Sequence, residues 1–206
     1  MSGFGPKSPE LVLIGEAPAK TEDDWCINCQ RPLAKSCLDN LHAIGQPLVG
    51  QAGQIIRQAL RDVGIDENLV YMTNVAKCGT GGSGNPNMLQ VRKCVGAYLL
   101  DELASLDYSR CKGVVLLGET AVRGVLNNGT LKIRDARLRD LNLYTDIVPV
   151  PLRAVYHPAA ALPHRNPGLY HEIVDDLRAL TKPRDSVKPV REIYSTSSLD
   201  IFSEAD

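Results

Sequence analysis

Four short apolar runs are spaced along the chain, and each ends in glycine or a polar residue. They are residues 11–14, 69–72, 113–117 and 148–156. Their side chains are mostly aliphatic or β-branched and show no regular alternation with polar ones, which is typical of strands buried on both faces of a sheet. The pattern therefore predicts four central strands.

Helical patterns separate these runs. Between residues 52 and 63, apolar side chains recur at the spacing of one helix face, and similar stripes run through residues 91–106, from Glu119 onwards and through residues 169–180. Strands that alternate with helices form a parallel sheet covered on both faces. We expect an α/β fold with three α/β/α layers and a central, mainly parallel four-stranded sheet.

The composition changes at Lys182. Residues 182–190 are punctuated by prolines, and residues 195–206 are polar and acidic. We expect one domain over residues 1–181 and a flexible acidic tail over residues 182–206. The alternative is a tail that binds a protein partner through Leu199, Ile201 and Phe202.

Composition narrows the class of protein. With 206 residues, 44% of them hydrophobic, the chain suits one globular domain with a core that needs no covalent staples. It contains neither a long apolar run nor a signal peptide, so we expect an intracellular protein with no membrane contact. We also expect a monomer. The net charge of −1 disfavours a broad nucleic-acid surface, so any contact with DNA must be local.

Polar side chains follow the predicted strands. Glu16 comes after the first, Asn74 after the second and His157 after the fourth. In an open parallel sheet, ligands bind outside the carboxyl ends of the strands. A carboxylate, an amide and an imidazole on one rim favour a catalytic site.

Five segments carry a resemblance to a known family. They are residues 15–19 (Gly-Glu-Ala-Pro-Ala), 45–53, 71–78, 114–121 and 157–162. They occur in the order seen in the uracil-DNA glycosylase superfamily, and the chain resembles family 4, its iron–sulfur branch. Ala19 is more similar to family 5. The resemblance covers residues 10–180 and implies a uracil-DNA glycosylase-like fold.

The resemblance implies a monofunctional DNA glycosylase. Such an enzyme flips uracil or a modified pyrimidine out of DNA, hydrolyses its N-glycosidic bond and leaves an abasic site. Glu16 would position the water, His157 would donate a hydrogen bond to the base oxygen, and Asn74 would pair with the base edge. No lysine falls in the matched catalytic motifs, so we expect no strand cleavage.

Further residues are assigned to binding. The residues expected around the base are Gly15, Ala17, Pro18, Leu48 and Asn74. Leu162 matches the wedge that fills the gap left by a flipped base, and Arg165 is a candidate phosphate contact. The glycine-rich loop of residues 79–86 offers backbone N–H groups to phosphate through Ser83, Gly84 and Asn85.

The cysteines favour a metal centre. Six cysteines in a reducing compartment argue against a disulfide framework. Cys26 and Cys29 form a close pair, and Cys78 and Cys94 match the family's second pair. The resemblance implies a [4Fe–4S] cluster on these four, with structural Zn²⁺ as the alternative. The close pair lies in an insertion at residues 20–44 instead of before the first strand, and Cys37 is a possible substitute ligand.

The sequence also departs from the family around the base. Leu48 replaces a phenylalanine that stacks on uracil, and Gln46 and Gln51 replace arginines. Drift explains this, or the target is a bulkier modified pyrimidine. The rival classes are a DNA-binding module that has lost catalysis and a nucleoside-processing hydrolase. The sequence contains neither the phosphate-binding loop nor the nucleophile elbow that would favour a nucleoside-processing hydrolase.

Overall fold

A central sheet of six strands organises the molecule. The computed structural model describes residues 1–206 except 41–42, 80–83, 140, 145–148, 182–192 and 196–206. Across the sheet the order is β4-β1-β5-β7-β6-β8. The strands are β1 (Leu11–Gly15), β4 (Val70–Asn74), β5 (Gly113–Leu117), β6 (Leu141–Tyr144), β7 (Pro149–Val155) and β8 (Ile193–Ser195).

The four predicted strands are confirmed as parallel neighbours. β1 pairs with β4 on one side and with β5 on the other, and β5 pairs with β7. All of β1, β4 and β5 is buried, which explains why their sequences show no alternation of apolar and polar residues.

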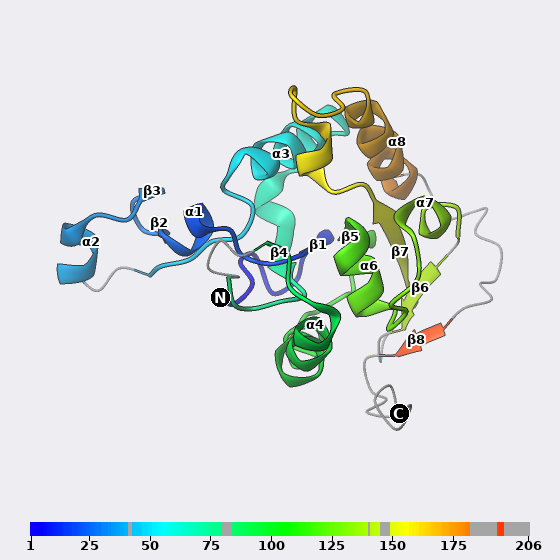
Figure 1. Cartoon of the computed structure of the whole chain (residues 1–206), viewed down its shortest axis with the longest axis horizontal. Helices are drawn as coiled ribbons and strands as arrows, with labels where there is room; N and C mark the ends of the chain where they lie inside the picture. Colours follow the sequence, from blue (N-terminus) through cyan, green and yellow to red (C-terminus); the bar gives the residue numbers. More distant parts are fainter. Residues whose placement is uncertain (41–42, 80–83, 140, 145–148, 182–192, 196–206) are drawn as a thin grey trace.

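Helices cover both faces of this sheet, so the predicted three layers are present (Figure 1). One face carries α3 (Gln51–Asp62) and α8 (Leu169–Thr181). The other face carries α4 (Met88–Cys94), the π-helical segment η2 (Val95–Leu99), α5 (Leu100–Ala104), α6 (Glu119–Val125) and α7 (Ile133–Ala136).

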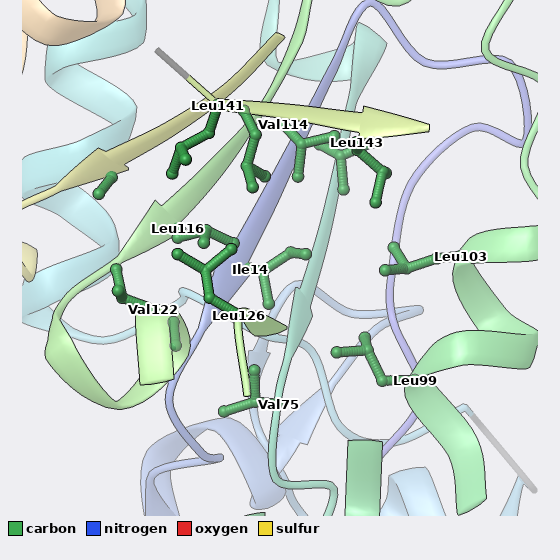
Figure 2. Packing of buried hydrophobic residues seen from close by; sticks show 14 of the residues in the cluster. Ile14, Val75, Leu99, Leu103, Val114, Leu116, Val122, Leu126, Leu141 and Leu143 are labelled. Atoms are coloured by element: carbon green, nitrogen blue, oxygen red, sulfur yellow. The ribbon is translucent and has the colours of Figure 1, made fainter. Parts of the chain in front are cut away.

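Successive residues of each central strand enter different cores, because side chains of a strand alternate between its faces. In β1, Leu11 and Leu13 pack with α3 and α8, whereas Val12 and Ile14 belong to the opposite core. Figure 2 shows this second core, where Ile14, Val114 and Leu116 of the strands meet Leu99, Leu103, Val122 and Leu126 of the helices.

The sheet is larger than the expected four strands. β6 joins the edge, antiparallel to β7, and β8 pairs with β6 in parallel. β6 has only four residues and includes the polar Asn142, so its sequence contains no continuous apolar run from which a strand could be predicted. β8 lies within the segment expected to be a solvated tail, where its backbone pairs with the open edge of β6. The other tail residues, including Leu199, Ile201 and Phe202, lie outside the described part.

The insertion at residues 20–44 forms a separate small unit. It contains α1 (Lys20–Asp23), β2 (Trp25–Cys26), β3 (Arg31–Pro32) and α2 (Lys35–Asp39), and β2 pairs with β3 as a two-stranded antiparallel hairpin. Figure 1 shows the hairpin and α2 projecting from one side of the body. Among the described residues, no helix is long and apolar enough to cross a membrane.

Candidate active site

The ends of β1 and β4 bring Gly15 and Asn74 together. The two residues are partners in the parallel register, and a Cβ atom on Gly15 would lie 2.4 Å from Asn74 Oδ1. Glycine therefore leaves room for the Asn74 amide across the end of β1. Asn74 is only 4% exposed, and its Nδ2 has no hydrogen-bond partner among the described residues. Buried donors are almost always paired, so this N–H group is available to a ligand.

Glu16 follows Gly15 directly and is half-buried. The backbone N–H of Ala76 donates to the Glu16 carbonyl oxygen at 2.9 Å, and that of Val75 donates to the Gly15 carbonyl oxygen at 3.0 Å. These two bonds extend the pairing of β1 and β4 beyond the strands. They fix the backbone from which Glu16 and Asn74 project.

His157 stands where β7 passes into the 3₁₀ helix η3 (Pro158–Ala161). Its Nδ1 accepts a hydrogen bond from the Ala159 backbone N–H at 3.2 Å. A neutral imidazole that accepts at Nδ1 carries its proton on Nε2, so His157 presents a donor there.

The electrostatics around His157 favour this neutral form. Burial lowers the pKa of His157 below its ordinary value of 6.5, the negative charge of Glu16 acts in the opposite direction, and Arg165 lowers the pKa further. Both charged residues thus lie near enough to act on the imidazole. Gly118 also lies beside His157. Its φ is +89°, and a Cβ at this position would come within 2.7 Å of His157 Cβ.

The three predicted catalytic side chains therefore share one edge of the sheet. Asn74 is adjacent to Glu16 through Gly15, and Glu16 acts on His157 through its charge. The arrangement offers one carboxylate, one amide nitrogen without a partner among the described residues, and one neutral imidazole donor. Such a set can bind a polar heterocycle and stabilise negative charge that develops on it.

The loop that contains Leu48 packs against the core on the α3 side of the sheet. Leu48 is 4% exposed and belongs to the core with α3, but its φ of +58° lies in the left-handed region, which is unfavourable for a branched side chain. A Cβ on Gly53 would come within 1.8 Å of the Leu48 carbonyl oxygen, so only glycine allows α3 to begin this close. Such strain persists only where surrounding contacts impose it.

Glu22 is one of those contacts, and the sequence did not single it out. Its buried carboxylate accepts hydrogen bonds from the backbone N–H groups of Leu48 at 2.8 Å and Ala19 at 3.1 Å. Burial raises the pKa of Glu22 despite these two bonds. Glu22 thus joins the loop after β1 to the loop before α3. Its position six residues after Glu16 was the available signal, but an acidic residue at the start of a short helix is common.

Comparison with known proteins defines the family. The model of the uracil DNA glycosylase superfamily matches residues 2–178. The chain belongs to this superfamily. It is 29% identical over 175 residues to the type-4 uracil-DNA glycosylase of Pyrobaculum aerophilum, covering 85% of this chain and 78% of the relative. It is also 29% identical over 183 residues to the type-4 enzyme of Archaeoglobus fulgidus, covering 86% and 78%.

A third relative agrees with these two. The type-4 uracil-DNA glycosylase of Thermotoga maritima is 25% identical over 175 residues, covering 85% of this chain and 78% of the relative. The resemblance inferred from the five motifs is therefore confirmed at the level of the superfamily.

Two of the residues assigned to DNA contact, Leu162 and Arg165, follow His157 along the chain of this superfamily member. Leu162 ends η3 and is half-buried, and its carbonyl oxygen accepts a hydrogen bond from the Arg165 backbone N–H at 2.8 Å. Arg165 is exposed, as a phosphate contact must be. Gly84 and Asn85 are exposed, whereas Ser83 lies outside the described residues.

The remaining base-pocket assignments follow β1. Ala17 is half-buried and Pro18 is buried, so both continue the chain along the edge that holds Glu16. Neither residue makes a side-chain hydrogen bond. Their assignment to the pocket stays a prediction.

The thiols of this superfamily member form two groups. The Sγ atoms of Cys26, Cys29 and Cys37 all lie within 4.8 Å of one another. Cys78 and Cys94, by contrast, line a cavity of about 430 Å³ together with Asn85. The structure therefore adds Cys37 to the close pair of Cys26 and Cys29, and it places Cys78 and Cys94 at a cavity of their own.

The close group has the ligand atoms and the spacing to hold a metal ion. Hydrogen bonding with Cys26, then burial and Cys37, raise the pKa of the Cys29 thiol. A bound cation would have the opposite effect on the pKa, because a coordinating thiol is deprotonated. Cys111 is buried apart from both groups, with its thiol donating to the Gly113 carbonyl oxygen at 3.3 Å.

Proposed function

We propose that this protein is a monofunctional DNA glycosylase that removes uracil or a modified pyrimidine from DNA. The observation that carries the proposal is the buried Nδ2 of Asn74, which has no partner among the described residues, at the edge of the sheet where Glu16 and His157 also follow strands. Membership of the superfamily and the three type-4 relatives support the same activity.

The chemistry of hydrolysis assigns a task to each side chain. Cleavage of the glycosidic bond leaves positive charge on the sugar and negative charge on the departing base. The Glu16 carboxylate orients water and stabilises the cationic sugar. The Nε2–H group of His157 donates to the base oxygen on which charge develops, and Asn74 holds the base edge. Water adds to the sugar carbon as the bond to the base breaks, so the strand stays intact.

The deciding experiment identifies the base that the protein releases. Oligonucleotides carrying uracil, cytosine or substituted pyrimidines, single- and double-stranded, are incubated with the full chain, and free bases are identified by mass. We expect a released pyrimidine and an alkali-sensitive abasic site. Glu16→Gln and His157→Ala should each lower release at least about 100-fold, the scale expected of these catalytic roles.

Three outcomes contradict the proposal. DNA binding without base release in any substrate indicates the catalytically silent module. Activity on free nucleosides with none on oligonucleotides indicates a nucleoside hydrolase. Strand breaks that appear without alkali or heat contradict the monofunctional mechanism.

Base flipping is part of the proposal, with Leu162 as the wedge. Extruding a paired base costs a few kcal/mol, whereas an unpaired strand has no such requirement. Leu162→Ala should therefore lower activity on double-stranded DNA about tenfold and on single-stranded DNA no more than about twofold. Equal losses on the two substrates contradict the wedge role.

The identity of the base depends on Leu48. Base–aromatic stacking contributes about 1–3 kcal/mol per base, which an aliphatic side chain does not supply. We propose that the loop with Leu48 and the insertion accommodate a modified pyrimidine. Rapid removal of uracil with no release of substituted pyrimidines contradicts this part and leaves the glycosylase assignment intact.

The cofactor is the remaining part. The resemblance to the iron–sulfur branch implies a [4Fe–4S] cluster on Cys26, Cys29, Cys78 and Cys94, which stays a prediction. In the structure, Cys26 and Cys29 are grouped with Cys37, and the three Sγ atoms all lie within 4.8 Å of one another. None of the steps above depends on the cluster.

The other expectations about partners also stay proposals. We propose that the protein acts on DNA as a monomer inside the cell, and that any partner protein binds through the tail at residues 182–206, by way of Leu199, Ile201 and Phe202. Mass measurement of the free protein in solution tests the monomer.

A further inference from the structure

We infer that Cys26, Cys29 and Cys37 form a binding site for a single metal ion, of the structural Zn²⁺ type, within the insertion at residues 20–44. This site is separate from the pair formed by Cys78 and Cys94. It goes beyond the proposed glycosylase activity, which does not depend on it.

The spacing of the sulfurs supports one ion over a cluster. Zn²⁺ binds sulfur at about 2.3 Å, and tetrahedral geometry then holds two such sulfurs about 3.8 Å apart. The distance between Cys29 Sγ and Cys37 Sγ is 3.8 Å. In a [4Fe–4S] cluster each cysteine binds a different iron, so the ligand sulfurs lie farther apart than sulfurs on one ion. All three sulfurs lie within 4.8 Å of one another.

The local fold brings these thiols together from three places. Cys26 lies on β2, Cys29 follows in the turn of the hairpin, and Cys37 lies in α2. Cys26 and Cys37 have no exposed surface, although the hairpin projects from the body. Buried thiols in a peripheral unit with two-residue strands are typical of a small metal-bound fold.

The insertion is too small to be stabilised by its own core. The strands β2 and β3 have two residues each and α2 has five. Units of this size normally need a metal ion or a disulfide, because they bury too little apolar surface to offset chain entropy. Three thiols and one further donor, a water molecule or another residue, complete a tetrahedral ion.

Hydrogen bonds connect the insertion to the loop that contains Leu48. The Ile27 backbone N–H donates to the Ala43 carbonyl oxygen at 2.9 Å, and the Gly45 N–H donates to the Trp25 carbonyl oxygen at 2.9 Å. The Gln30 side chain donates to Gln46 Oε1 at 3.1 Å. An ion that holds the hairpin together therefore also restrains the loop before α3.

The experiment measures metal content in the full chain purified without oxygen. Zinc and iron are quantified by mass spectrometry, with visible absorbance as an independent indicator of iron–sulfur. We expect about one zinc ion per chain, as a three-thiolate structural site holds one. Cys37→Ser and Cys29→Ser should each lose it, and the more exposed Cys29 provides the test if the first variant fails to fold.

Matched cysteine variants locate the ion. The double variant Cys78→Ser/Cys94→Ser should keep the zinc, and so should Cys111→Ser, which removes a buried thiol elsewhere. Chelation of the wild type should make trypsin cleave rapidly after the exposed Lys35, and added zinc should restore resistance.

Other results overturn the inference. Iron with visible absorbance that is lost in Cys78→Ser/Cys94→Ser shows a cluster shared between the two groups. A wild-type chain without metal, a Cys29–Cys37 disulfide, or zinc retained in both Cys29→Ser and Cys37→Ser excludes the site. Because metal content is independent of base release, these results leave the glycosylase assignment untouched.

Discussion

The Asn74 side chain carries a hydrogen-bond donor that is buried and, among the described residues, unpaired. Folding alone gains nothing from such a group, because its desolvation is not compensated. A bound pyrimidine that accepts from Nδ2 would recover this free energy. The same reasoning makes Asn74 a residue whose removal separates binding from stability.

Asn74→Ala should lower base release about 10- to 100-fold, because a site that hydrogen-bonds the substrate loses roughly 1–3 kcal/mol with its polar partner. The melting temperature should not fall substantially, since Nδ2 bonds to no described residue. Asn142→Ala, at another buried asparagine on the edge strand β6, is the matched control and should keep full activity. Activity equal to wild type in Asn74→Ala removes Asn74 from the site.

His157 is the residue whose protonation should control activity at acidic pH. Its pKa lies below 6.5 chiefly because of burial, so the neutral, Nε2-donating form persists through neutral pH. The folded chain binds fewer protons than the unfolded chain just below pH 6.5. The contribution of His157 to stability is therefore complete above that pH and is lost as the pH falls through its folded pKa.

Nuclear magnetic resonance can follow this titration. The His157 ring should titrate below pH 6.5 in the folded protein and near 6.5 in urea. Glu16→Gln removes the charge that raises the pKa and should lower it further, whereas Arg165→Ala should raise it. No change in either variant means that neither charge acts on the imidazole.

At the scale of elements, the junction between the Leu48 loop and α3 is held by several contacts, and Leu48 is a residue that we propose to line the base pocket. Leu48 is kept in the left-handed region by contacts at its N–H and carbonyl groups. The Glu22 carboxylate accepts a hydrogen bond from the Leu48 N–H group, and Arg57 Nε donates to the Leu48 carbonyl oxygen at 3.2 Å. The loop is thus a strained element over-determined by its neighbours.

Gly53→Ala should disturb this junction, because the added Cβ would collide with the Leu48 carbonyl oxygen at 1.8 Å. We expect a loss of about 1–3 kcal/mol of stability, typical of overpacking, together with reduced base release. Gly64→Ala is the control: its φ is +74°, but nothing lies within 4 Å. It should cost stability and leave activity unchanged. Thermal melts and release assays distinguish the two, and unaltered activity in Gly53→Ala means that the loop does not shape the site.

At the scale of the whole molecule, the net charge of −1 restricts how DNA is bound. Affinity for phosphate must come from a few local groups, since no overall positive field attracts the duplex. At the end of η3, the half-buried Leu162 is followed by the exposed Arg165, whose charge acts on His157.

Arg165→Ala should therefore weaken DNA binding and reduce the slope of log affinity against log salt by about 1, the value for one lost phosphate contact. Arg110→Ala is the matched control, because Arg110 precedes β5 at the opposite end of the sheet and is paired with Glu10 at 2.8 Å. Titrations at several salt concentrations provide the slopes. The same slope in wild type and Arg165→Ala contradicts the phosphate contact.

The sequence determined the central strands, the order of strands and helices, and the residues that follow each strand. Runs such as residues 11–14 and 113–117 are apolar because both faces are buried, and that local signal is enough to locate β1 and β5. The rim with Glu16, Asn74 and His157 followed from topology alone, since parallel strands end at the same edge.

Only the tertiary structure decided contacts between segments that are distant or locally unremarkable. The edge strands β6 and β8 are too short to produce a pattern and exist because a neighbour offers open backbone groups. Glu22 became a loop-fixing residue only through its contact with Leu48. The grouping of Cys37 with Cys26 and Cys29 depends on how the hairpin and α2 fold, because spacing along a chain does not set distances between thiols. Periodicity encodes what each segment buries, whereas such pairings depend on the packing of the whole chain.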